Sequence, residues 1–407
     1  MSTSADFRAG ADAQPAGPKV LHCLRAPVGG LFRHVRDLVR AQSAMGFRVG
    51  ILCADEPNDT LTLSRLAALE SFCSLGITRL ALGRMPGVSD VKALLSAGWL
   101  IEDMQPDVLH GHGAKGGLIS RMVRAPTHVA RIYTPHGGTI HFPPLSPGGL
   151  VFGLAERFMM KRTHGLIFES GFARSVFEER FGFGGECAAV VYNGVTEAEF
   201  EPVTLVEKPA DFLFLGELRA LKGIFTLLDA VRKVSDEREI SVAVVGSGPD
   251  ENAFRERVEA LGLQDRVCMH GVLPARKAFA LGRAVVMPSH HDSFPYVALE
   301  TAAVGRPLIA TRTGGIPEIF GAQAEHLVTP QSVDSLREAL LSFLDDPQMH
   351  VGRAETLQKF VATEFSVRRM ALGVAMVYRH AALSDEPSLR RMRDANFPVS
   401  KMDAVNE

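Results

Sequence analysis

The sequence has few of the features that mark secreted, membrane-spanning or nucleic-acid-binding proteins. Its five cysteines are odd in number and scattered among 407 residues, with no C-x-x-C pair and no Cys/His metal spacing. We therefore expect free thiols in a reducing compartment. No apolar run reaches the roughly 20 residues that a membrane span needs. Lysine and arginine number 44 against 46 acidic residues, a balance that gives no indication of nucleic-acid binding.

The two ends of the sequence are polar and lack the signals of export. Residues 1–17 contain no apolar core of the kind a signal peptide carries, and their composition predicts disorder. Residues 385–407 are polar and are expected to fray. We therefore expect a cytoplasmic protein. A length of 407 residues favours two domains.

Short apolar runs alternate with helix-periodic stretches along the whole chain. Residues 20–24, 31–45 and 49–53 are typical of a strand, a helix and a second strand. Further strands are expected at 77–82, 108–110, 130–134, 211–215, 241–245, 267–272, 284–287 and 307–311. This alternation predicts an α/β fold with parallel sheets covered by helices on both faces. The expected parts are domains 18–205 and 206–350, then terminal helices over 351–384.

Residues 288–318 hold the most informative group of polar residues, P-S-H-H-D-S-F-P-Y-V-A-L-E-T-A-A-V-G-R-P-L-I-A-T-R-T-G-G-I-P-E. The pattern predicts a loop, a helix over 296–304 and a strand. Asp292 then precedes the helix and Glu300 lies inside it. An acid in an apolar helix is costly to bury unless it is paired. Either Glu300 caps or pairs locally, or both acids face a polar ligand above the helix N-terminus, where free N–H groups attract phosphate.

This segment resembles the E-x7-E region of the retaining family-4 glycosyltransferases, also called glycosyl transferases group 1, which have the GT-B fold. The matching positions are Pro288, Ser289, Phe294, Pro295, Val297, Leu299, Glu300, Ala303, Gly305, Pro307, Ala310, Thr311, Gly314, Gly315 and Glu318. Asp292 stands where the family has glutamate, which keeps the charge and shortens the reach. The likeness runs from residue 20 to about residue 380. It implies two Rossmann-like doubly wound domains facing across a cleft, with a C-terminal helix that crosses back to the first domain.

Two cations in the segment G-E-L-R-A-L-K-G are candidates for binding a diphosphate. Arg219 and Lys222 flank a turn before a helix, an arrangement that suits phosphate; the alternative is two exposed residues of a turn. The family form is G-R-L-x-x-x-K-G, so Glu217 replaces the usual arginine. The resemblance implies that Lys222 and Arg219 are catalytic, neutralising the leaving group of a nucleotide-diphosphate sugar, and that the loop at Gly246 lies near the nucleotide.

The resemblance also assigns the remaining donor contacts. Glu300 is implied to bind the ribose hydroxyls. Asp292 and the backbone of Phe294, Pro295 and Tyr296 are implied to hold the donor sugar. The glycine spacing at 246–248 lacks the third glycine of a dinucleotide fingerprint, which disfavours an NAD dehydrogenase.

On the first domain, a glycine pair and a histidine complete the expected site. Gly29 and Gly30 precede a helix, where they form either a simple tight turn or a place for backbone to approach a phosphate; the resemblance favours the second reading. His136 lies in P-H-G-G past a strand end, where open α/β sheets hold ligands, and the resemblance implies an active-site role. His110 and His112 are interpreted as structural or acceptor-side.

Two stretches raise the question of a membrane surface. The first helix region holds Arg25, Arg33, Arg36, Arg40 and Arg48 against Asp37. These cations form either an ordinary solvated face or, as in comparable family members, a face toward lipid or phosphate-bearing acceptors. Residues 142–165 hold a Pro/Gly loop and a helix that could dip into a membrane, but we favour packing of Leu154, Phe158 and Met159 inside the domain.

The resemblance implies a retaining glycosyltransferase of bacterial surface polysaccharide or lipid-linked glycan synthesis, acting on a glycan or lipid-linked acceptor, with peripheral contact at the inner membrane as a hypothesis. No D-x-D occurs, so no metal–diphosphate clamp is indicated and neither a metal nor a cofactor is expected. No nucleic-acid partner is expected, and the sequence does not indicate an oligomeric state. A GT-B sugar-nucleotide epimerase and a non-catalytic nucleotide-binding scaffold are the alternatives.

Overall fold

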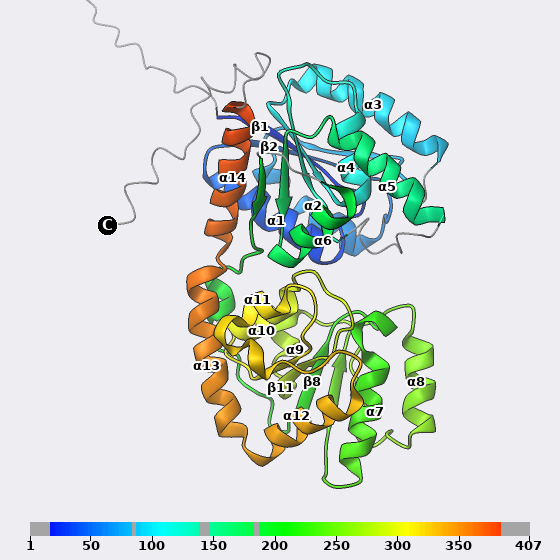
Figure 1. Ribbon diagram of the computed structural model, residues 1–407, viewed down its shortest axis with the longest axis vertical. Helices are drawn as coiled ribbons and strands as arrows, with labels where there is room; N and C mark the ends of the chain where they lie inside the picture. Colours follow the sequence, from blue (N-terminus) through cyan, green and yellow to red (C-terminus); the bar gives the residue numbers. More distant parts are fainter. Residues whose placement is uncertain (1–16, 84–86, 138–146, 183–186, 384–407) are drawn as a thin grey trace, which may run out of the picture.

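The computed structural model describes residues 17–383 except 84–86, 138–146 and 183–186. Two α/β domains lie one above the other in Figure 1, and the last two helices run along one side of both. No helix of the described residues is both long and apolar enough to cross a bilayer.

The first domain is built on a seven-stranded parallel sheet. Its strands are ordered β3-β2-β1-β4-β5-β6-β7. In chain order its elements are β1 (Lys19–Cys23), α1 (Gly29–Ala44), β2 (Arg48–Ala54), α2 (Thr60–Ala67), η1 (Glu70–Phe72), β3 (Ile77–Leu80), α3 (Val88–Met104), β4 (Val108–His112), α4 (Gly113–Met122), β5 (Ala130–Thr134), α5 (Pro147–Met160), β6 (Gly165–Phe168), α6 (Gly171–Phe181) and β7 (Ala188–Val190).

The second domain has a five-stranded parallel sheet in the order β10-β9-β8-β11-β12. Its elements are η3 (Glu197–Phe200), β8 (Ala210–Leu215), η4 (Ala220–Lys222), α7 (Ile224–Ser235), β9 (Val242–Val245), α8 (Glu251–Ala260), β10 (Val267–Met269), α9 (Ala275–Ala278), β11 (Gly282–Met287), α10 (Tyr296–Ala303), β12 (Leu308–Ala310), α11 (Ile316–Phe320), η5 (Gly321–His326), α12 (Val333–Asp345) and α13 (Pro347–Glu364). The final helix, α14 (Val367–Leu383), packs on the first domain.

Each sheet has one point at which the chain reverses the direction in which it adds strands. In the first sheet this point lies between β1 and β4, and in the second between β8 and β11. Loops leaving such neighbouring strands diverge to opposite faces and open a crevice at the carboxyl ends, where α/β sheets bind ligands. The fold therefore provides one candidate crevice per domain, and the two are brought together by the domain arrangement.

The helix α14 completes the core of the first domain. Met370, Val374 and Tyr378 of α14 are fully or almost fully buried in the cluster that also contains Val35 and Leu38 of α1. Meanwhile α13 packs on α10 of the second domain. The chain thus returns to its first domain after finishing the second.

One packing prediction is wrong. Met159 of α5 is buried, but Leu154 and Phe158 are exposed rather than packed inside the domain. The cause is the position of α4, which lies between α3 and α5 and is itself largely buried. The outer faces of α3 and α5 are consequently left toward solvent.

Candidate active site

A cavity of about 600 Å³ lies where the two crevices meet. It is lined by the sequence-predicted residues Gly29, Gly30, His136, Arg219, Lys222, Asp292, Phe294, Pro295, Tyr296 and Glu300. Its walls come from α1 and the loop after β5 on one side, and from the loops after β8 and β11 on the other. The structure thus gathers residues as distant in sequence as Gly29 and Glu300 around one space.

The wall from the second domain carries an ion pair. Lys222 stands at the end of η4, directly before α7, and its Nζ lies 2.6 Å from Oδ1 of Asp292. Both side chains are mostly but not fully buried. Arg219 lines the same wall and is exposed. A lysine, an arginine and the start of a helix thus face one end of the cavity, which suits a polyanionic group.

Gly314 and Gly246 of the second domain allow backbone segments next to the cavity to approach each other closely. A Cβ on Gly314 would lie 1.4 Å from the carbonyl oxygen of Asp292, so only glycine lets the loop carrying Asp292 settle there. In the same way, a Cβ on Gly246 would lie 1.8 Å from the carbonyl oxygen of Gly216. Gly246 is absent from the residues that line the cavity. It braces the loop after β8 instead of forming a wall, and its place near the nucleotide stays a prediction.

Arg33 of α1 connects the two domains across the cavity. Its guanidinium donates to the carboxylates of Glu300 and Glu199 and lies 4.2 Å from the centre of the Tyr296 ring. Glu300 is therefore paired, with a partner from the other domain instead of a local one. Arg33 is mostly buried, and Arg36 pairs with Asp37, so this part of α1 is not the solvated or lipid-facing surface that its charge allowed.

Sequence reasoning missed Glu169 as a cavity residue. It directly follows β6, is buried, and lines the cavity. Burial raises the pKa of its carboxyl to about 7, although a hydrogen bond to Ser293 acts in the opposite direction. The available signal was its position: an acid at the carboxyl end of a buried parallel strand, next to a predicted helix start.

His136 belongs to a group of five buried or half-buried imidazoles in the first domain. His22 and His110 are register partners on β1 and β4, at the switch point of the sheet. Nδ1 of His112 lies 3.1 Å from Nε2 of His136, and the backbone of His136 has φ of 49°. That region is uncommon for a residue other than glycine and is often held at functional sites. Burial lowers the pKa of His110, His112 and His136 well below the ordinary value.

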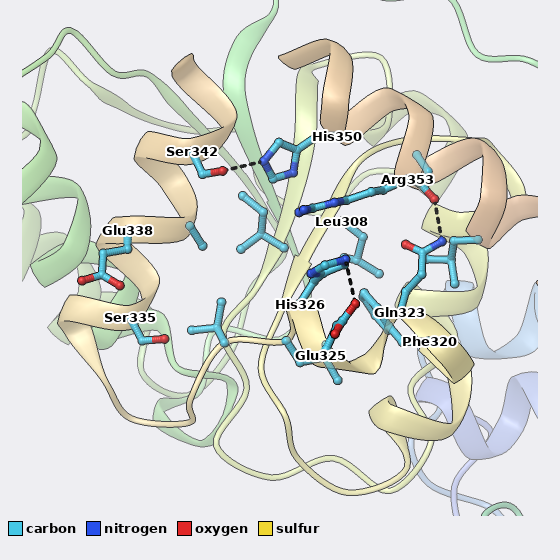
Figure 2. Close-up of a pocket in the computed structure, with 16 residues that line it drawn as sticks. Leu308, Phe320, Gln323, Glu325, His326, Ser335, Glu338, Ser342, His350 and Arg353 are labelled. Carbon is cyan, nitrogen blue, oxygen red and sulfur yellow. Dashed lines mark hydrogen bonds and ion pairs between the residues drawn. The ribbon is translucent and has the colours of Figure 1, made fainter. Parts of the chain in front are cut away.

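A second cavity, of about 290 Å³, lies within the second domain between η5, α12 and α13 (Figure 2). Two hydrogen bonds join side chains of this cavity to nearby groups: His350 bonds Ser342, and Gln323 donates to the carbonyl oxygen of Arg353. None of the sequence-predicted site residues lines it. The chemistry expected from the sequence is therefore associated with the cavity between the domains.

Comparison with known proteins agrees with this assignment. The family model for Glycosyltransferase Family 4 matches residues 28–199, and the family model for Glycosyl transferases group 1 matches residues 195–360. The chain belongs to the family-4, group 1 glycosyltransferases. A glycogen synthase of Mycobacterium tuberculosis is 26% identical to this glycosyltransferase over 382 residues, which cover 86% of the chain and 91% of the relative.

Solved structures confirm the predicted GT-B fold of the glycosyltransferase. The sucrose-phosphate synthase of Thermosynechococcus elongatus matches with a TM-score of 0.73 and 20% identity, over 89% of this chain and 98% of that one. The Anabaena protein HepE, solved in complex with UDP, matches with a TM-score of 0.70 and 17% identity, over 89% and 99%. At these identities the likeness shows the fold alone.

Proposed function

We propose that this glycosyltransferase moves a sugar from a nucleotide-diphosphate donor to a hydroxyl of a glycan acceptor, with retention of anomeric configuration and without a metal on the diphosphate. The observation that carries the proposal is the position of Lys222. It stands beside the start of α7 in a cavity walled by both domains. A cation there can neutralise the charge that grows on a diphosphate leaving group.

The donor is oriented by the second domain. Lys222 exchanges Asp292 for the diphosphate, with Arg219 as a second cation, while Asp292 and the backbone of residues 294–296 accept and donate hydrogen bonds to the sugar. Oε1 of Glu300 accepts a hydrogen bond from the Arg33 guanidinium. The other carboxylate oxygen, Oε2, can then accept a hydrogen bond from a ribose hydroxyl. Gly29, Gly30 and His136 close the site from the first domain.

The state of the acids in the cavity supports retention by front-face attack. Glu300 is held by Arg33, and burial raises the pKa of Glu169 to about 7 and so opposes its ionised form. Asp292, when Lys222 turns to the diphosphate, hydrogen-bonds the sugar hydroxyls. None of these three is then left as a free carboxylate ready to form a covalent glycosyl intermediate. In the proposed step the bond from the anomeric carbon to the diphosphate oxygen breaks. The acceptor oxygen bonds to the same face, and its proton passes to the departing phosphate.

A thermal-shift screen against UDP-, GDP-, ADP- and TDP-sugars, with and without a chelator, tests the donor assignment. A ligand at 100 times its dissociation constant stabilises the folded state by about 2.7 kcal/mol. We expect one nucleotide series to raise the melting temperature equally in both conditions, and Lys222→Ala to lose the shift. Lys277→Ala, an exposed lysine on α9, is the matched control. A shift that chelator abolishes and Mg²⁺ restores contradicts the proposal of a metal-free diphosphate. An isomerised donor recovered without acceptor would identify an epimerase.

The acceptor side of the proposal is a lipid-linked glycan at a membrane surface. Val91, Leu95 and Trp99 form an exposed stripe along α3, and Leu150, Leu154 and Phe158 form another along α5; Trp99 is 77% exposed and Leu154 68%. Exposed cations lie among these apolar residues: Lys92, Arg124, Arg157, Lys161 and Arg162. Apolar stripes at helical spacing with interspersed cations suit the interface of an anionic bilayer.

Vesicle flotation tests the membrane surface. We expect the enzyme to bind phosphatidylglycerol-containing vesicles better than purely zwitterionic ones, and the double variants Leu95→Ser/Trp99→Ser and Leu154→Ser/Phe158→Ser to lose binding while keeping their melting temperature. Val272→Ser, an exposed apolar residue of the second domain, should bind like the wild type. No binding by the wild-type enzyme would contradict the membrane proposal. Self-association that the same double variants abolish would instead make this face a contact between copies of the enzyme.

A further inference from the structure

The buried imidazoles of the first domain offer more than the proposed sugar contact of His136. One ring nitrogen from each of His34, His112 and His136 lies within 4.8 Å of the others. Their ring centres are separated by 4.8, 5.5 and 5.4 Å. His34 comes from α1, His112 from the end of β4, and His136 from the loop after β5. Three separate elements therefore converge their imidazoles on one point beside the cavity.

One nitrogen of this group has no hydrogen-bond partner. Nδ1 of His34 lies 2.9 Å from Oδ1 of Asn193, whose Nδ2 donates to the carbonyl oxygen of Phe294. The amide orientation is thereby set, so Nδ1 of His34 carries the ring proton and Nε2 carries a lone pair. His34 is 1% exposed, and Nε2 is buried without a partner. A buried polar atom left in this way calls for an explanation.

The tautomer of His112 is set by a second amide. Nε2 of His22 donates to Oε1 of Gln42 over 2.8 Å, because Nε2 of Gln42 is directed to the Tyr378 hydroxyl. Nδ1 of His22 must then accept, and it does so from Nε2 of His112 at 3.0 Å. This leaves a lone pair on Nδ1 of His112, directed at His136. The two amides thus fix the tautomers of His34 and His112, each of which keeps a lone pair on one ring nitrogen.

We propose that His34, His112 and His136 bind a divalent transition-metal ion of the Zn²⁺ class. Zinc–nitrogen bonds of 2.0–2.1 Å in a tetrahedral site separate ligand nitrogens by about 3.3 Å, and His112 Nδ1 and His136 Nε2 are already 3.1 Å apart. Two of the three ligands donate their other N–H to a fixed partner, as metal-binding histidines do. Imidazole ligands favour zinc, cobalt, nickel or copper over magnesium.

The neighbouring triad of His22, His110 and His112 fits a metal less well. His110 uses both ring nitrogens, with the Tyr378 hydroxyl at 2.7 Å and Thr134 Oγ1 at 2.8 Å, and all three residues are buried. An ion bound by His110 would break at least one of its two hydrogen bonds to residues outside the triad, whereas an ion at the proposed site replaces the hydrogen bond between two of its own ligands, His112 and His136. His136 is partly exposed and lines the cavity, so the proposed site has an entrance and an open fourth position.

A bound ion changes what His136 offers to a ligand. Without the ion, Nε2 of His136 donates its proton to His112. With the ion on Nε2, the ring proton moves to Nδ1, and that nitrogen changes from an acceptor to a donor. The ion also joins α1 to the loop after β5. This metal is distinct from a diphosphate-bound metal, because its ligands belong entirely to the first domain.

Cobalt absorption on tag-free, chelator-treated enzyme tests the site directly, independently of sugar transfer. We expect stoichiometric Co²⁺ to produce the intense visible bands of a tetrahedral centre and Zn²⁺ to displace it. His34→Gln and His136→Gln should each weaken binding beyond the roughly 10- to 100-fold that loss of an outer-shell partner costs. His110→Gln keeps all three ligands and should retain the bands, as should His380→Gln, an exposed histidine on α14.

Melting curves without metal establish that each variant is folded. Absence of the bands from the wild-type enzyme overturns the proposal. Bands that persist in both folded variants His34→Gln and His136→Gln overturn it as well. Loss of the bands in folded His110→Gln, with retention in His34→Gln, would place the ion in the neighbouring triad and equally contradict the site proposed here.

Discussion

The two walls of the cavity hold their polar groups in different ways. Apart from Arg33, whose charge is matched by Glu300 and Glu199, the first domain presents imidazoles and Glu169, which are buried, and burial opposes their charged forms. The second domain presents Lys222 and Asp292 as a charged pair that remains partly open to solvent. A neutral wall is costly to ionise and keeps its geometry, whereas a charged pair can exchange partners when a diphosphate arrives. The difference supports the proposal that Lys222 of the second domain binds the diphosphate of the donor.

The largest expected effect comes from removing the cation of the second wall. Lys222→Ala should lower kcat/KM by about 10²- to 10³-fold, as removal of a principal transition-state charge contact does. Steady-state kinetics with the donor found in the thermal screen measures it, with Lys277→Ala as the control. Wild-type turnover in Lys222→Ala would show that this lysine takes no part in the reaction. The difference between the two walls would then have no bearing on catalysis.

Glu169 tests the neutral wall through the pH dependence of stability. Because its folded pKa is raised to about 7, the folded state keeps a proton that the unfolded chain loses from about pH 4.5 upward. Its contribution to stability is thus full below pH 4.5 and is lost as pH rises to 7. One pKa unit corresponds to about 1.4 kcal/mol. Raising the pH from 5 to 8 should therefore destabilise the wild type relative to Glu169→Gln by up to about 3 kcal/mol of unfolding free energy.

Urea unfolding at several pH values measures this shift. The matched control is Glu217→Gln, which removes an exposed carboxylate from the second domain and so separates the loss of a carboxylate from the loss of a buried one. A flat difference for Glu169→Gln would mean that Glu169 is ionised in the fold, and that the first wall is not neutral.

Glu300 should show a smaller effect, on binding more than on chemistry. Glu300→Gln keeps the shape but weakens a charge-assisted hydrogen bond, which contributes about 1.5–3 kcal/mol, so we expect donor affinity to fall by roughly tenfold or more. Calorimetric titration with the matching nucleoside diphosphate isolates this loss from the transfer step. An unchanged affinity together with a reduced kcat would move Glu300 from ribose binding to the reaction itself.

The smallest expected effect belongs to Arg219. It is exposed, so solvent screens its charge, and exposed charges of this kind contribute about 1 kcal/mol or less. Arg219→Ala should therefore lower kcat/KM by only a few fold. If Arg219 stands in for the family arginine at position 217, Glu217→Arg should restore activity to Arg219→Ala. A loss as large as that of Lys222→Ala would make both cations equal partners.

The sequence predicted the fold and most of the cavity, because polar residues after strands converge at the carboxyl edge of a parallel sheet. It could not predict the pairing of Arg33 with Glu300, because these residues are separated by 267 positions and belong to different domains. Nor could it settle the faces of α5, since Leu154 and Phe158 have the same helical spacing whether they face a core or solvent.

The return of α14 to the first domain has a consequence for how the protein is made. The hydroxyl of Tyr378 on α14 is hydrogen-bonded to His110 and Gln42, next to the buried imidazoles of the first domain. The helix α14 also packs against α1 and completes the core. When residues 18–205 have been synthesised, the first domain therefore still lacks one helix of its core. Its apolar surface stays uncovered until almost the whole chain has been translated. The second domain has then already emerged, so the first domain to be synthesised is the last to be completed.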